Sequence, residues 1–106
     1  MKEVFRTRII LYECGLDPSH PCWGGKQNGS GVCGREIIYV IKREEDKFVV
    51  YSQYHEYNTH SVYMDDHVHH YGEIVRDREF DTLEEAKEYI EEIRELREYK
   101  PEEYIL

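Results

Sequence analysis

The sequence contains no apolar run of the length that a membrane-spanning helix needs. Residues 1–8 alternate charged and apolar side chains and lack the continuous apolar region of a secretory signal peptide. We therefore expect no membrane association and a cytoplasmic location, which is the host cell cytoplasm if the source is a virus. Clusters of Lys and Arg are also missing, and the formal net charge is −9, so direct binding to a nucleic-acid backbone is not expected.

The negative charge is concentrated toward the C-terminal end. Residues 79–106 contain eleven acidic and four basic residues, whereas residues 1–78 contain twelve acidic and ten basic ones. Part of the acidic excess recurs at helical spacing, at Glu84, Glu88, Glu91, Glu95 and Glu98. Such a row is either a solvated helix face or an acidic surface that binds a basic protein partner or imitates nucleic acid.

Alternation of apolar and polar residues predicts β-strands in most of the chain. We expect strands near 4–12, 36–43, 47–54 and 73–80. A short polar break separates the second strand from the third and favours a hairpin. A smaller, His-rich hairpin is expected over 55–72. No linker or internal repeat interrupts the pattern, so residues 1–106 are expected to form a single domain.

The strongest local pattern predicts a helix over 82–99. Thr82 and Glu85 fit a capping box, and Pro101 would end the helix. The apolar side chains recur at helical spacing, at Leu83, Ala86, Ile90 and Ile93. The predicted fold class is therefore α+β: an antiparallel sheet of four to five strands with one C-terminal amphipathic helix packed on one face.

The seven residues Phe80-Asp81-Thr82-Leu83-Glu84-Glu85-Ala86 resemble the strand-to-helix junction of small β-β-β-α proteins, including HicB-type antitoxins. This resemblance implies a strand that leads directly into a helix. The Pro- and Gly-bearing signature that precedes the junction in those antitoxins is absent here, so the resemblance concerns the fold alone.

All three cysteines lie in a Gly-rich loop expected over 14–34. Together with one histidine they give a set of three thiols and an imidazole, a known ligand set of structural zinc, at Cys14, His20, Cys22 and Cys33. The spacing differs from the tight Cys-x-x-Cys pairs of zinc knuckles. A second interpretation is a Cys14–Cys33 disulfide, because these residues lie at the two ends of one strand connection. The third is that the thiols are inert and buried.

Five of the six histidines fall between positions 55 and 70. On a strand, His67 and His69 would point the same way. Together with Glu73 they resemble the first metal motif of cupins, which implies a metal site on these three residues. The glycines that flank that motif are replaced here, and the predicted helix occupies the place of the second motif. The alternative is a polar hairpin that exposes His and Tyr side chains.

From these patterns we expect a small acidic protein that binds another protein without catalysis. It would regulate or inhibit a larger, possibly nucleic-acid-handling host machine, and viral and mobile-element proteins are often of this kind. The alternative is a small metal-dependent hydrolase or nuclease that uses the histidine cluster, and a third interpretation is a structural subunit of a particle. Zinc is the only cofactor that the residues suggest, and a homodimer is compatible with the composition.

Overall fold

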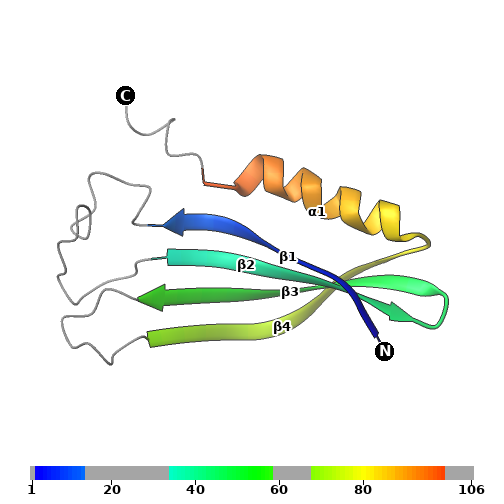
Figure 1. Cartoon of the computed structure of the whole chain (residues 1–106), viewed down its shortest axis with the longest axis horizontal. Helices are drawn as coiled ribbons and strands as arrows, with labels where there is room; N and C mark the ends of the chain where they lie inside the picture. Colours follow the sequence, from blue (N-terminus) through cyan, green and yellow to red (C-terminus); the bar gives the residue numbers. More distant parts are fainter. Residues whose placement is uncertain (1, 14–33, 59–67, 100–106) are drawn as a thin grey trace.

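In residues 2–13, 34–58 and 68–99, which the computed structural model describes, four antiparallel strands form one sheet and one helix lies across a face of it (Figure 1). The elements are β1 (Lys2–Glu13), β2 (Gly34–Glu44), β3 (Lys47–Asn58), β4 (Val68–Phe80) and α1 (Leu83–Arg97). The strands lie in the order β1-β2-β3-β4, so each pairs with its neighbour in sequence. The predicted α+β class with an antiparallel sheet is confirmed, with four strands. The described helix is too short and too charged to span a lipid bilayer.

The strands β3 and β4 are longer than the sequence predicts. The strand expected over 47–54 continues to the end of β3, and the strand expected over 73–80 begins earlier, at the start of β4. The described parts of the predicted hairpin 55–72 therefore belong to these two long strands, and residues 59–67 lie outside the described part of the chain. Two pairs of rings face each other across the added parts of β3 and β4, His55 with Tyr71 and Tyr57 with His69. Such cross-strand ring pairs stabilise the pairing of two strands.

The core lies between α1 and one face of the sheet. Its fully or almost fully buried members are Ile9, Tyr39, Ile41, Val50, Ala86 and Ile90. Of the four helix positions that the spacing predicts, Ala86 and Ile90 are completely buried, and Leu83 and Ile93 pack against the core at its margin. The apolar stripe of α1 thus packs on the sheet, and burial of these side chains supplies the main favourable term in folding.

The ends of α1 follow from capping chemistry. The Thr82 hydroxyl oxygen accepts a hydrogen bond from the Glu85 backbone N–H at 3.2 Å, and the hydroxyl donates to the Glu85 carboxylate at 3.1 Å. At the other end the backbone N–H of Glu98 donates to the Arg94 carbonyl at 2.9 Å. The helix is therefore somewhat shorter than the predicted 82–99, and Pro101 lies outside the described residues.

The C-terminal end of α1 is attached to β1. The backbone N–H of Tyr99 donates to the Ile10 carbonyl at 2.7 Å. Arg94 donates to the Arg8 carbonyl at 3.1 Å and to the Thr7 hydroxyl at 2.9 Å. Figure 1 shows the helix running from the end of β4 to this attachment beside β1. Side chains alternate along a strand, so Glu36, three positions before the core residue Tyr39 on β2, points to the opposite face of the sheet.

Candidate functional site

The face of the sheet opposite α1 carries a polar chain that we call the histidine relay, formed by Arg8, Glu36, His55 and His69, with Glu36 and His55 buried at its centre and Arg8 and His69 exposed at its ends. Glu36 and His55 face each other across β2 and β3 and are only 5% and 6% exposed. Arg8 donates to one carboxylate oxygen of Glu36 at 2.9 Å, and Nδ1 of His55 lies 3.1 Å from the other. Burial of a carboxylate is costly unless it is paired and hydrogen-bonded, and both oxygens here have a partner.

The relay continues from β3 to β4. Nε2 of His55 lies 2.9 Å from Nδ1 of His69, so both ring nitrogens of His55 are engaged. Tyr71 stacks on His55, with ring centroids 4.2 Å apart and ring planes 4° from parallel. Tyr57 covers Gly34 on β2 so closely that a Cβ there would lie 2.1 Å from the end of the tyrosine side chain, so a larger residue at this position would displace the ring. These contacts hold the imidazole of His55 in one orientation.

The hydrogen bonds of the two histidines run in one direction. With Nδ1–H of His55 donating to Glu36, Nε2 of His55 accepts from Nδ1–H of His69, which leaves Nε2 of His69 as an acceptor. This acceptor belongs to the exposed residue at the end of the relay.

The structure does not bring the predicted metal ligands His69 and Glu73 together, and His67 lies outside the described residues. The register of β3 and β4 shifts between Gln53 and His55, so β4 bulges opposite this point. Because of the bulge, Glu73 lines the side of the sheet that faces α1, whereas His69 bonds to His55 on the other side. Within the described residues, no group of three or more His, Cys, Asp or Glu side chains could hold a metal ion.

The second predicted ligand set, Cys14, His20, Cys22 and Cys33, lies outside the described residues. The residues next to its two end members are described: Glu13 and Gly34 are directly paired at the end of β1 and β2. The chain therefore leaves β1 and enters β2 at one place. The zinc, disulfide and free-thiol interpretations stay predictions.

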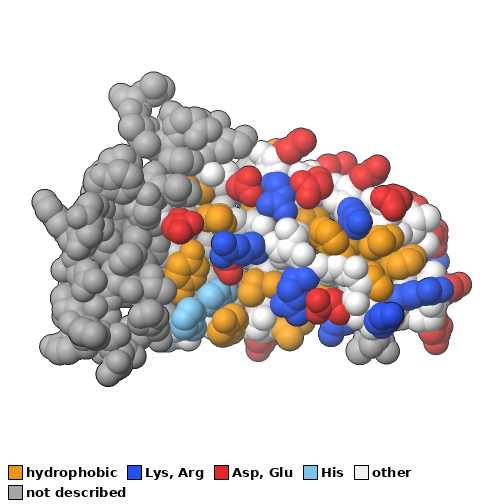
Figure 2. All heavy atoms as spheres, viewed as in Figure 1, with side chains coloured by type: hydrophobic (Ala, Val, Ile, Leu, Met, Phe, Trp, Pro, Cys, Tyr) orange, Lys and Arg blue, Asp and Glu red, His pale blue; other side chains and the backbone are white. Residues whose placement is uncertain are grey.

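The outer side of α1 carries the predicted acidic row. Figure 2 shows Asp and Glu side chains gathered over this helix. Arg94 pairs with Glu91 at 3.0 Å and with Glu98 at 2.7 Å, so two members of the row share one cation and the three groups keep a net charge of −1. In the described part of the chain no ion pair or hydrogen bond joins the side chains of Glu84, Glu88 or Glu92 to another residue.

The acidic row thus differs in detail from the sequence prediction. Glu95 is exposed on the same side, and Glu92 adds a carboxylate that the predicted row did not include. Leu96 lies among these acids with 85% of its surface exposed, so the outer face combines negative charge with one apolar side chain.

Sequence reasoning did not single out Glu36 as part of a site. A signal was present, because Glu36 precedes an otherwise apolar central strand, and a charged residue in such a strand indicates a buried partner. The identity of that partner depends on the strand register, which the sequence pattern does not specify.

Comparisons with protein-family models, with curated proteins and with solved structures find no match for this chain. Its function is therefore argued from the geometry of the histidine relay and the acidic face of α1.

Proposed function

We propose that this protein is a non-catalytic protein-binding module that regulates or inhibits a larger, nucleic-acid-handling machine of its host. In this proposal the outer face of α1 binds a basic surface of the partner. The observation that carries it is the set of exposed carboxylates that form no ion pair with another described residue, at Glu84, Glu88 and Glu92.

Physical chemistry supports a role of these carboxylates in recognition. Unpaired surface charges of one sign raise the association rate with an oppositely charged partner, and they disfavour partners of like charge. The charges lie along one helix that packs on the core through Ala86 and Ile90 and is attached to β1 at its C-terminal end, so the partner meets a row held on the sheet. The effect acts over about 8 Å at physiological ionic strength, and added salt therefore weakens it.

The histidine relay favours a second candidate function, a small hydrolase in which His69 acts as the base. Glu36 orients His55, and His55 in turn orients His69, as a general base requires. The described residues place only this one imidazole at the exposed end of the relay, however, and binding by α1 remains the better supported proposal.

Two double variants with equal change of charge test the proposal. Glu88→Lys with Glu92→Lys reverses two unpaired acids on α1, and Glu45→Lys with Asp46→Lys reverses two exposed acids at the β2–β3 turn. Each protein is used to capture partners from host lysate, and the captured partner is then purified for measurement of the association rate. Wild-type and turn-variant proteins should bind alike, and the helix variant should associate at least about tenfold more slowly at low salt.

The salt dependence and a chemical cross-link complete the test. The difference between helix and turn variants should shrink as salt is raised from about 50 to 300 mM, because screening removes the attraction. A carbodiimide should join Glu88 or Glu92 to lysines of the partner. Equal loss in both variants would show that total charge, not the helix face, matters. His69→Ala tests the hydrolase alternative. If the partner, once captured, is cleaved by the wild-type protein and not by this variant, the alternative is favoured; equal behaviour of the two proteins argues against it.

A further inference from the structure

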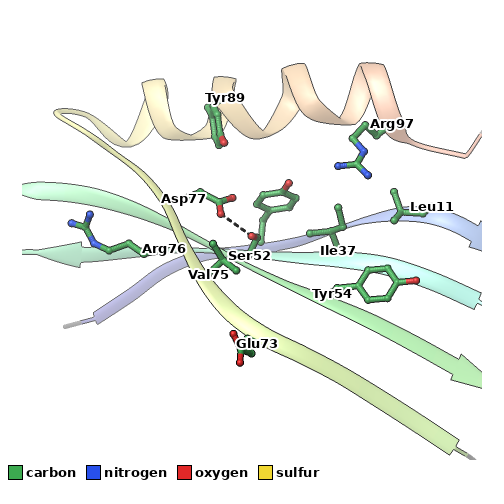
Figure 3. A pocket seen from close by; sticks show the side chains of 11 residues that line it. Leu11, Ile37, Ser52, Tyr54, Glu73, Val75, Arg76, Asp77, Tyr89 and Arg97 are labelled. Carbon is green, nitrogen blue, oxygen red and sulfur yellow. Dashed lines mark hydrogen bonds between the residues drawn. The ribbon is translucent and has the colours of Figure 1, made fainter.

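A cleft of about 540 Å³ opens between the inner side of α1 and the face of the sheet that the helix covers (Figure 3). All four strands contribute residues to its lining, and α1 contributes Tyr89 and Arg97. Ile37, Val75 and Leu11 supply apolar walls. The volume is in the range of small-molecule sites, which are apolar clefts with a few convergent polar groups.

Tyr39 places an unpaired hydroxyl in this cleft. The residue is 4% exposed and lines the cleft. Among the described residues, every side-chain nitrogen or oxygen that is fully shielded has a hydrogen-bond partner. No hydrogen bond joins the Tyr39 hydroxyl to another described residue. Buried tyrosines usually do have a partner, so this hydroxyl, on a residue that lines the cleft, is a candidate donor to a ligand there.

Opposite charges face the cleft from its two sides. Asp77 on β4 accepts a hydrogen bond from Ser52 at 2.9 Å, which leaves carboxylate acceptor positions unused. Arg97 extends from α1, and no ion pair or hydrogen bond joins it to another described residue. In Figure 3, Asp77 lies on the side of Tyr89 and Arg97 on the side of Leu11.

The remaining charged groups of the lining do not alter this arrangement. Arg76 is paired with Glu79 at 3.1 Å, and Glu73 is exposed. Burial raises the pKa of Tyr39, Asp77 raises it further, and Arg97 lowers it, so this hydroxyl lies within the field of both charges. Burial and Asp77 also raise the pKa of Tyr89. Both tyrosines are therefore protonated donors at neutral pH.

We propose that the cleft binds a small zwitterion with an apolar body, namely an apolar amino acid or a dipeptide. The ligand carboxylate would meet Arg97 and the Tyr39 hydroxyl, the ammonium group would meet Asp77, and the apolar side chain would lie on Ile37 and Val75. A simple anion would be repelled by Asp77, and a simple cation by Arg97. An apolar ligand would cover all three polar groups without pairing them, which is costly, and an uncharged polar ligand would lack the charge-assisted hydrogen bonds, which are the stronger ones. A zwitterion pairs both charges at once.

The proposal is tested with the full chain by NMR titration. The probes are L-phenylalanine and the dipeptide Leu-Phe, each with its free termini, and N-acetyl-phenylalanine amide, which has the same ring without either charge. The free probes should shift the amide signals of Ile37, Ser52 and Val75 with dissociation constants of about 1 mM or tighter. The blocked probe should not. Tighter binding of the amino acid or of the dipeptide identifies which length spans Asp77 and Arg97.

Conservative variants separate the proposed contacts from structural effects. Arg97→Gln and Asp77→Asn should each weaken binding about tenfold or more, and Tyr39→Phe about three- to tenfold, because hydrogen bonds to charged groups are the stronger ones. Arg76→Gln, which removes a lining charge already paired elsewhere, should bind as wild type. The proposal is overturned if no free probe shifts these signals at 10 mM, if the blocked probe binds equally well, or if Arg97→Gln and Asp77→Asn both leave binding unchanged.

Discussion

Tyr71 lies flat on the imidazole of His55, with 4.2 Å between the ring centroids and 4° between the ring planes. The two residues are direct partners across β3 and β4. Tyr71 is 58% exposed and His55 is 6% exposed, so the outer ring shields the inner one from water. The burial of the relay thus depends on a side chain that is itself at the surface.

The stacked ring of Tyr71 is expected to stabilise the fold. Tyr71→Ala removes the stack and opens His55 to solvent, and it should lower the free energy of unfolding by about 1–2 kcal/mol. Tyr71→Phe keeps the ring and should be nearly neutral, since the described residues offer no partner to the Tyr71 hydroxyl. Urea denaturation measures both. Equal losses in the two variants would mean that the hydroxyl, not the ring, is what matters.

Glu36 should be worth more to stability than Arg8, although they form one ion pair. Glu36→Gln presents an amide N–H₂ group to one of two donors, Arg8 or His55, and should cost about 2–3 kcal/mol. Arg8 is 59% exposed at its side chain, so Arg8→Ala should cost less than about 1 kcal/mol. Chemical denaturation of the two variants checks the order, and the reverse order would contradict the relay as described.

Ile90 and Leu96 are two apolar residues of α1 in opposite environments. Ile90 is completely buried in the core, whereas Leu96 is almost fully exposed. Ile90→Ala should cost about 2–4 kcal/mol, because it removes buried methyl groups and leaves a cavity. Leu96→Ala should change the free energy of unfolding by less than about 0.5 kcal/mol. Calorimetry or denaturation of both variants measures whether α1 is docked through its predicted stripe.

The β2–β3 turn contains a residue with an unfavourable backbone angle. Glu45 has a φ of 58°, in the left-handed region that favours glycine. Glu45→Gly should therefore stabilise the protein by up to about 1 kcal/mol, because it relieves this conformation. Asp46→Gly in the same turn is the control and should destabilise slightly through backbone entropy. A gain from both variants, measured by thermal unfolding, would point to a cause other than the angle at Glu45.

Glu13 and Gly34, the neighbours of Cys14 and Cys33 in sequence, are direct partners across β1 and β2. The prediction that these two cysteines share a disulfide or a zinc ion can be tested by mass spectrometry. If Cys14 and Cys33 share a disulfide, intact mass should rise by about 2 Da on reduction, and if they share zinc, native mass should fall on chelation. Serine variants at either position should abolish whichever signal is seen. A mass that responds to neither treatment leaves the free-thiol interpretation.

The main architecture could be predicted from local patterns. Alternation over 4–12 predicts a strand, and the spacing of Leu83, Ala86, Ile90 and Ile93 predicts a helix. In each case the apolar period of the sequence marks the face of the element that packs on the core. The same patterns did not predict that Glu73 and His69 lie on opposite sides of β4. That separation arises from a bulge, which depends on how β3 and β4 pair and not on the order of residues in either strand.

The histidine relay could not be predicted from the sequence for a related reason. Nineteen positions separate Glu36 from His55, and their contact requires the register of β2 with β3. A shift by one residue would have placed the two side chains on opposite faces. The acidic row on α1, by contrast, lies within one helix, where spacing alone specifies which side chains share a face.

The attachment of α1 to β1 makes the two edges of the sheet unequal. The carbonyls of Arg8 and Ile10 already accept hydrogen bonds from Arg94 and Tyr99, so a strand added beside β1 would have to detach the end of the helix. On β4, the other edge of the described sheet, the Gly72 carbonyl accepts a hydrogen bond from the Gln53 side chain, and α1 donates no hydrogen bond to a described carbonyl of this strand. Strand addition beside β4 would therefore leave α1 in place, whereas addition beside this part of β1 would cost the bonds that hold the end of the helix.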